Sequence, residues 1–121
     1  MAVQPKRLLE VQTMDTVAVV SIMQGRILDD QIIQQFGDQL NSLVDQAGHQ
    51  RILLNFGKVD YLSSAALGKL VVLRKKIEAV KGKLALSNID PSIFDAFKIT
   101  GFDRIFKIYD EEQEALQFLQ K

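Results

Sequence analysis

Short apolar runs alternate along this chain with longer stretches in which apolar residues recur every three to four positions. The run at residues 52–56, Ile-Leu-Leu-Asn-Phe, is nearly continuous, which is typical of a strand covered on both faces of a sheet. Helical periodicity precedes and follows this run. Because strands that alternate with helices through short links usually pair in parallel, this alternation predicts an α/β fold.

The two longest helical stretches each have one clear apolar face. The first is predicted over residues 30–47, with Asp29 as its N-cap and Gly48 where it ends. Its apolar face comprises Ile33, Phe36, Leu40, Leu43 and Ala47. The second stretch ends before Gly82, and its apolar face comprises Ala66, Leu70, Leu73, Ile77 and Val80. Both helices are therefore predicted to pack against the sheet.

Shorter elements complete the predicted order. They are strands at residues 8–13, 17–22, 83–87 and 104–109, a short helix between Asp90 and Gly101, and a final helix that Asp110 caps. Only a few residues separate the first two strands, so these two must form an antiparallel hairpin. The order β-β-α-β-α-β-α-β-α predicts a single domain over residues 1–121. Its sheet is expected to be mixed and mostly parallel, with roughly four to five strands, an antiparallel N-terminal strand and about four helices.

The composition excludes several classes of function. Lys plus Arg and Asp plus Glu both number 15, so there is no basic excess for nucleic-acid binding. The absence of cysteine excludes disulfides and thiolate chemistry. No apolar stretch is long enough for a signal peptide or for membrane insertion, so the expected location is cytoplasmic.

Residues that usually carry catalysis do not cluster in the sequence. The only histidine, His49, follows Gly48 in a polar turn, where a solvated loop residue is the simpler interpretation. The seven glycines are scattered, and their spacing matches no phosphate-binding loop. No catalytic residue, metal site or cofactor is therefore predicted, and the chain is expected not to be an enzyme.

Residues 59–68 stand out because they follow the buried strand and open the second helix. In a parallel sheet this position lies beyond the carboxyl end of a strand, where α/β folds usually place their sites. Ser63 and Ser64 stand at the helix start, and on spacing alone helix capping is the simpler interpretation. A phosphate there would be tolerated by the free N–H groups of the helix, whereas a partner packed over it would meet unpaired charges. A serine at this position could therefore act as a switch that leaves the fold unchanged.

This segment and those after it resemble the STAS family, the domain shared by sulfate transporters and bacterial anti-sigma factor antagonists. The family pattern Asp-Ser-Ser/Thr-Gly-Leu-Gly corresponds here to residues 63–68, anchored by Leu67 and Gly68. Further matches, in the expected order, are Lys75-Lys76, Gly82-Lys83-Leu84, Asn88-Ile89-Asp90-Pro91, Phe97-Lys98-Ile99-Thr100-Gly101-Phe102 and the acidic turn before Glu-Ala-Leu at residues 110–116. The lack of a membrane segment favours the antagonist branch over a transporter tail.

On this alignment the phosphorylated serine of the family falls on Ser64, and the aspartate before it falls on Ser63. The next two family positions, Ser/Thr and Gly, fall on Ala65 and Ala66. A shift of one residue would select Ser63 as the phosphoacceptor instead. Asp60 is a candidate to replace part of the role of the missing carboxylate.

The resemblance also implies a partner-binding surface around the serine. It would comprise Asp29, Asp60, Tyr61, Leu62, Ser63, Ser64, Ala65 and Leu67. Asp29, at the start of the first helix beside this loop in the family fold, is equally well explained as a helix cap.

What the resemblance implies for function is a partner-switching cycle. The unmodified domain binds an anti-sigma factor, itself a serine kinase with a histidine-kinase-like ATPase fold, and so frees the sigma factor. The kinase then phosphorylates the antagonist with ATP and releases it, and a PP2C-type phosphatase resets it. The antagonist is a substrate, so no catalytic residue is expected within it.

Two alternatives remain open from the sequence. The first keeps the fold without the switch, as a constitutive scaffold of the kind found in stressosome-like assemblies or lipid-transport ABC complexes. The second is a small enzyme or nucleotide-binding domain of flavodoxin-like architecture. The missing phosphate loop and the lack of a clustered acid–base pair count against this second alternative.

Overall fold

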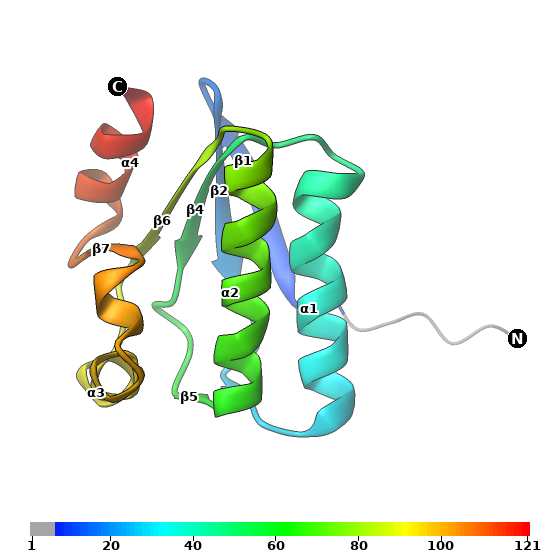
Figure 1. Cartoon of the computed structure of the whole chain (residues 1–121), viewed down its shortest axis with the longest axis vertical. Helices are drawn as coiled ribbons and strands as arrows, with labels where there is room; N and C mark the ends of the chain where they lie inside the picture. Colours follow the sequence, from blue (N-terminus) through cyan, green and yellow to red (C-terminus); the bar gives the residue numbers. More distant parts are fainter. Residues whose placement is uncertain (1–6) are drawn as a thin grey trace, which may run out of the picture.

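The computed structural model describes residues 7–121, which form a five-stranded sheet with helices on both faces (Figure 1). The first six residues of the predicted domain lie outside the described residues. In spatial order the strands are β1 (Leu9–Met14), β2 (Val17–Ile22), β4 (Arg51–Asn55), β6 (Lys83–Ser87) and β7 (Lys107–Tyr109). β1 and β2 are antiparallel, and the other neighbours are parallel. The predicted fold class and the antiparallel N-terminal strand are therefore confirmed.

Four α-helices connect or follow these strands within the described residues. They are α1 (Asp30–Asp45), α2 (Ser64–Ala79), α3 (Pro91–Thr100) and α4 (Glu112–Gln120). α1 and α2 lie side by side on one face of the sheet, and α4 covers the other face (Figure 1). None of these helices combines the length and the hydrophobicity that crossing a bilayer would require.

The continuous apolar run of β4 follows from coverage on both faces. Ile52 and Leu54 pack in the core beneath α1 and α2, while Leu53 packs with Ala115 and Leu119 of α4. All three β4 side chains are fully buried. Alternate residues of a strand point to opposite faces, so only a sheet covered on both sides hides three successive apolar residues.

Several predicted boundaries shift in the structure. α1 ends at Asp45, so the predicted Ala47 lies beyond it and is exposed. Val80 likewise follows the end of α2 and is exposed. The last strand begins at Lys107, because Phe102–Arg104 forms a 3-10 helix after the left-handed Gly101 has ended α3. At the ends of α1 and α2 the apolar residues keep the helical spacing beyond the last helical residue. The spacing therefore predicts helices that are too long.

The predicted cap of the last helix is wrong by one residue. Glu111, not Asp110, is the N-cap of α4. Glu111 and Glu114 form a capping box, in which each side chain accepts a bond from the backbone of the other. These reciprocal bonds satisfy two amides at once, which favours Glu111 over a single acceptor at Asp110.

A second, two-stranded sheet lies where the sequence suggested only loops. β3 (Arg26–Ile27) pairs in parallel with β5 (Tyr61–Leu62). The backbone bonds extend beyond these strands, since the Asp60 N–H donates to the Gly25 carbonyl at 2.7 Å. Such short strands carry no periodicity, so their pairing could not be predicted locally. The pairing of β3 with β5 joins the segments that lead into α1 and α2.

Candidate functional site

The candidate site lies at the end of the sheet where β3 and β5 pair. Helices α1 and α2 both begin at this end, so their free N–H groups and positive dipole ends face the same side of the molecule (Figure 1). The Ser63 N–H donates to the Ile27 carbonyl at 3.1 Å, which links the start of α2 to the segment before α1. Backbone hydrogen bonds thus hold the two loops together.

Asp29 caps α1, as predicted. Its Oδ1 accepts a hydrogen bond from the Ile32 N–H at 2.9 Å, and the residue is exposed. The carboxylate therefore has a structural role already, and it lies at the start of the helix beside α2. Its part in partner binding remains a prediction.

The two serines differ in what their hydroxyls do. Ser63 is the N-cap of α2, and its Oγ accepts a bond from the Ala66 N–H at 3.2 Å. Ser64 is the first residue of α2 and is exposed, and its hydroxyl has no hydrogen-bond partner anywhere in residues 7–121. Of the two candidates, only Ser64 presents an exposed and unengaged hydroxyl.

Replacing Ser63 by alanine is expected to lower the free energy of unfolding by about 1 kcal/mol, because the Ala66 amide loses its acceptor. Ser64→Ala, one residue later, is expected to change it by less than about 0.5 kcal/mol, since the side chain is exposed. Urea unfolding followed by circular dichroism measures both values. Equal losses in the two variants would contradict the assignment of Ser63 as the cap.

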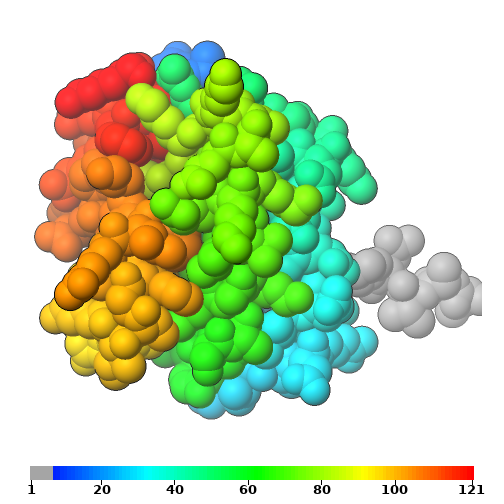
Figure 2. Space-filling view, in the orientation of Figure 1, coloured from blue at the N-terminus to red at the C-terminus, as the bar shows by residue number. Residues whose placement is uncertain are grey.

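A groove of about 430 Å³ opens beside Ser64, between the start of α2 and α3. Its lining comprises Asp60, Tyr61, Leu62, Ser64, Leu67, Ser92, Ile93, Ala96, Ile99 and Thr100. Figure 2 shows α2 and α3 next to each other on this face of the molecule. Two large apolar side chains on the rim are exposed, Ile99 at 86% and Tyr61 at 44%. Apolar exposure of this extent beside a groove marks a surface suited to a partner.

Of the described residues that line the groove, only Asp60 is charged, and Arg26 and Asp90 lie next to lining residues. The Arg26 guanidinium lies over the ring of Tyr61, 5.7 Å from its centroid. The Ser92 hydroxyl and backbone N–H both donate to the Asp90 carboxylate, and these bonds hold the pKa of Asp90 below its usual value. Asp60 lines the groove with Ser64, yet no hydrogen bond joins the two in the described part of the chain. Asp60 therefore does not reproduce a carboxylate bonded to the serine.

The structure brings most of the predicted site residues together. Asp60, Tyr61, Leu62, Ser64 and Leu67 line the groove. The other three lie close by, Ser63 as the helix cap, Ala65 exposed on α2 and Asp29 at the start of α1. The sequence reasoning missed the wall that α3 contributes, which comprises Ser92, Ile93, Ala96, Ile99 and Thr100. The observation that identifies this wall is the exposure of the Ile99 side chain, and only the folded structure gives the exposure of a side chain.

The groups that the groove presents are suited to recognition. Within residues 7–121 no three His, Cys, Asp or Glu side chains gather closely enough to hold a metal ion. His49 lies in the turn after α1, at the opposite end of that helix from the groove. What the groove presents is a hydroxyl at a helix N-terminus, set in an apolar rim.

Comparison with known proteins agrees with this fold. Residues 8–115 match the model of the STAS domain family. The chain is 30% identical over 105 residues to BtrV of Bordetella bronchiseptica, assigned by name as an anti-sigma factor antagonist, and the match covers 85% of this chain and 89% of BtrV. The chain therefore belongs to the STAS family.

Two solved structures show the same architecture. The crystal structure of tm1081 from Thermotoga maritima, described as an anti-sigma factor antagonist, superposes with a TM-score of 0.81 at 26% identity, over 93% of this chain and 95% of tm1081. The phosphorylated form of SpoIIAA, a Bacillus cell fate determinant, superposes with a TM-score of 0.67 at 21% identity, over 90% and 96% of the two chains.

Proposed function

We propose that this chain is an anti-sigma factor antagonist that binds its anti-sigma factor through the surface around Ser64 and is released when Ser64 is phosphorylated. The observation that carries the proposal is the exposed, unengaged hydroxyl of Ser64 at the first position of α2. Family membership and the assigned names of BtrV and tm1081 support the same function. In this role the chain acts as one cytoplasmic domain over residues 1–121, is a substrate and not an enzyme, and needs no cofactor.

The position of Ser64 explains how a phosphate would be tolerated by the fold. Phosphorylation adds about 1.5 to 2 negative charges at neutral pH. The first N–H groups of α2 and the positive end of its dipole would stabilise them. Since Ser64 is exposed, the added group displaces no core side chain. The domain thus stays folded when it is modified.

The same position explains how a phosphate would eject a partner. A surface that covers Tyr61 and Ile99 also covers the groove that Ser64 lines. Burying the phosphate in that apolar contact removes its hydration without supplying an opposite charge. Binding is therefore incompatible with phosphorylation, while the hydroxyl is small and neutral enough to be accommodated.

The cycle requires two enzymes that act on Ser64. We expect the anti-sigma factor itself to carry serine kinase activity and to use ATP, and a PP2C-type phosphatase to restore the hydroxyl. The phosphorylated form in which SpoIIAA was solved supports this expectation at the level of the fold.

Phosphorylation of the purified chain tests the proposal. Each serine-kinase anti-sigma factor of the source organism is incubated with the chain and MgATP, and the intact mass is measured. We expect one of them to add a single phosphate to the wild type and to Ser63→Ala, and none to Ser64→Ala. A phosphate on Ser63, or no modification by any of these kinases, would refute the proposed switch.

A constitutive scaffold is the second candidate, and one observation favours it. Ser63 occupies the position of the family aspartate, and Asp60 makes no bond to Ser64 that would replace that carboxylate. If the chain is a scaffold, Ser64→Ala and Ser64→Asp both bind the partner as the wild type does. The kinase assay and this binding comparison together separate the two candidates.

A further inference from the structure

We propose that the docking surface continues from Ser64 along the outward side of α2, over Gly68 and Val72, to Lys75. We infer that the anti-sigma factor brings a segment of its own close to Gly68 and places a carboxylate opposite Lys75. This inference rests on the proposed function and adds to it the chemistry of the partner surface.

Gly68 is the first reason for this inference. It lies inside α2 with helical backbone angles and is exposed, although glycine is less stable than alanine in a helix. A Cβ built on Gly68 would have no heavy atom within 4 Å apart from its chain neighbours and the backbone of its own helix. Gly37 differs, because the Lys69 side chain already fills the place of its Cβ, 2.6 Å away. Nothing within the described chain requires glycine at position 68, whereas a partner chain that approaches closely would require it.

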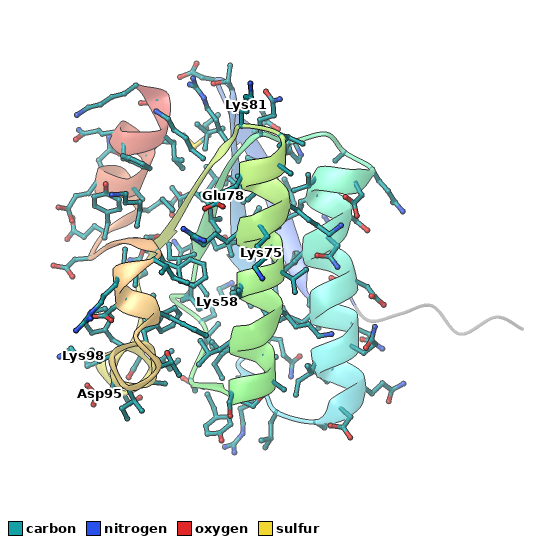
Figure 3. The ribbon with its side chains drawn as sticks, viewed as in Figure 1. Lys58, Lys75, Glu78, Lys81, Asp95 and Lys98 are labelled. Atoms are coloured by element: carbon teal, nitrogen blue, oxygen red, sulfur yellow. The ribbon has the colours of Figure 1, made fainter. Side chains whose placement is uncertain are left out.

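The spacing of the exposed residues is the second reason. Ser64, Gly68, Val72 and Lys75 follow one another at steps of four, four and three, so they lie on one side of the helix. Val72 is 43% exposed. Ile99 of α3 lines the groove with Ser64, where this side of α2 begins. Figure 3 shows Lys75 on the face of α2 that is turned away from the sheet. The candidate phosphoacceptor is therefore the first of four exposed residues on one side of α2, of which only Lys75 is charged.

The charge balance of α2 is the third reason, and it indicates that the partner surface carries an acidic group. The helix carries four cations and one carboxylate, namely Lys69, Arg74, Lys75, Lys76 and Glu78. Arg74 pairs with Glu78 at 2.8 Å, and Lys76 pairs with Asp45 of α1 at 2.9 Å. Lys69 and Lys75 form no ion pair with any residue from 7 to 121, and of these two only Lys75 is exposed. An acidic group on the partner is the complement to this free cation.

Adding a side chain at position 68 tests whether the anti-sigma factor approaches Gly68 closely. Binding is measured by calorimetry with the anti-sigma factor that phosphorylates Ser64 in the assay above. Gly68→Ala is expected to raise the melting temperature by about 4 °C, while weakening binding by about tenfold. Gly68→Leu is expected to weaken binding by at least about a hundredfold. Gln117→Leu, which places the same leucine side chain on the exposed side of α4, is expected to leave affinity unchanged.

Reversing the charge of Lys75 tests whether the partner surface opposite it is acidic. Lys75→Glu is expected to weaken binding by about tenfold at low salt, and the difference is expected to shrink as salt is added. Lys107→Glu makes the same change of charge on the exposed edge strand β7 and is expected to bind like the wild type.

The outcomes distinguish this inference from the proposed function. Wild-type affinity in both Gly68→Leu and Lys75→Glu, together with loss of binding in Ser64→Asp, would overturn the extended surface and leave the switch standing. If neither the wild type nor Ser64→Ala binds any serine-kinase anti-sigma factor of the organism, both proposals fail. A more stable Gly68→Ala that binds less well supports the inference, because a purely structural glycine would not separate the two effects.

Discussion

Ser64→Asp is expected to lower the affinity of the chain for its anti-sigma factor about a thousandfold, with no loss of stability. An unpaired carboxylate buried in an interface costs several kcal/mol, and about 4 kcal/mol corresponds to a factor of a thousand. In the free chain the same carboxylate lies at the first position of α2, where the helix dipole favours a negative charge. The melting temperature is therefore expected to stay the same or to rise slightly.

Titration calorimetry with the purified anti-sigma factor measures this loss of affinity, and circular dichroism confirms the fold of each variant. Ser64→Ala is the matched variant: it is expected to bind like the wild type and to stay bound when ATP is added. Gln117→Asp adds the same charge on the exposed side of α4, and it is expected to have no effect on binding. An affinity of Ser64→Asp equal to that of the wild type would show that the partner does not cover Ser64.

Gly82→Ala is expected to lower the free energy of unfolding by about 3 kcal/mol, because, of the glycines described, its added Cβ meets the closest obstacle. The Lys83 N–H donates to the Gln50 carbonyl at 2.7 Å where β4 and β6 begin to pair. A Cβ on Gly82 would fall on that same carbonyl and also approach the side chain of Ile77 at 3.1 Å. Because the obstacle is backbone, it can move only if the pairing of Arg51 with Lys83 is lost.

Urea unfolding of Gly82→Ala, compared with Gly37→Ala, measures this steric cost. At Gly37 an added Cβ would meet the flexible side chain of Lys69, which is free to swing aside, so the change is expected to be close to neutral. A loss of less than about 0.5 kcal/mol in Gly82→Ala would show that the strand entry relaxes without breaking its hydrogen bond.

Local patterns were sufficient for most of the fold. The apolar run of β4, the hairpin of β1 and β2 and the faces of α1 and α2 were all predictable, because each depends on residues a few positions apart. The Asp29 cap was predictable for the same reason, since its bond to Ile32 spans three residues. The ends of the helices were less predictable, because an apolar residue such as Ala47 continues the period without continuing the helix.

The sequence by itself determined the family-like segment at residues 59–68 and narrowed the candidate switch to two adjacent serines. It could not choose between them, because the choice depends on which residue takes the extended backbone of the cap. That residue is Ser63, which leaves the hydroxyl of Ser64 unengaged. Only the tertiary structure shows which serine caps the helix, how β3 pairs with β5 and which wall α3 adds to the groove. The physical reason is that these contacts join segments tens of residues apart, whereas sequence periodicity reports only which residues share a face of one element.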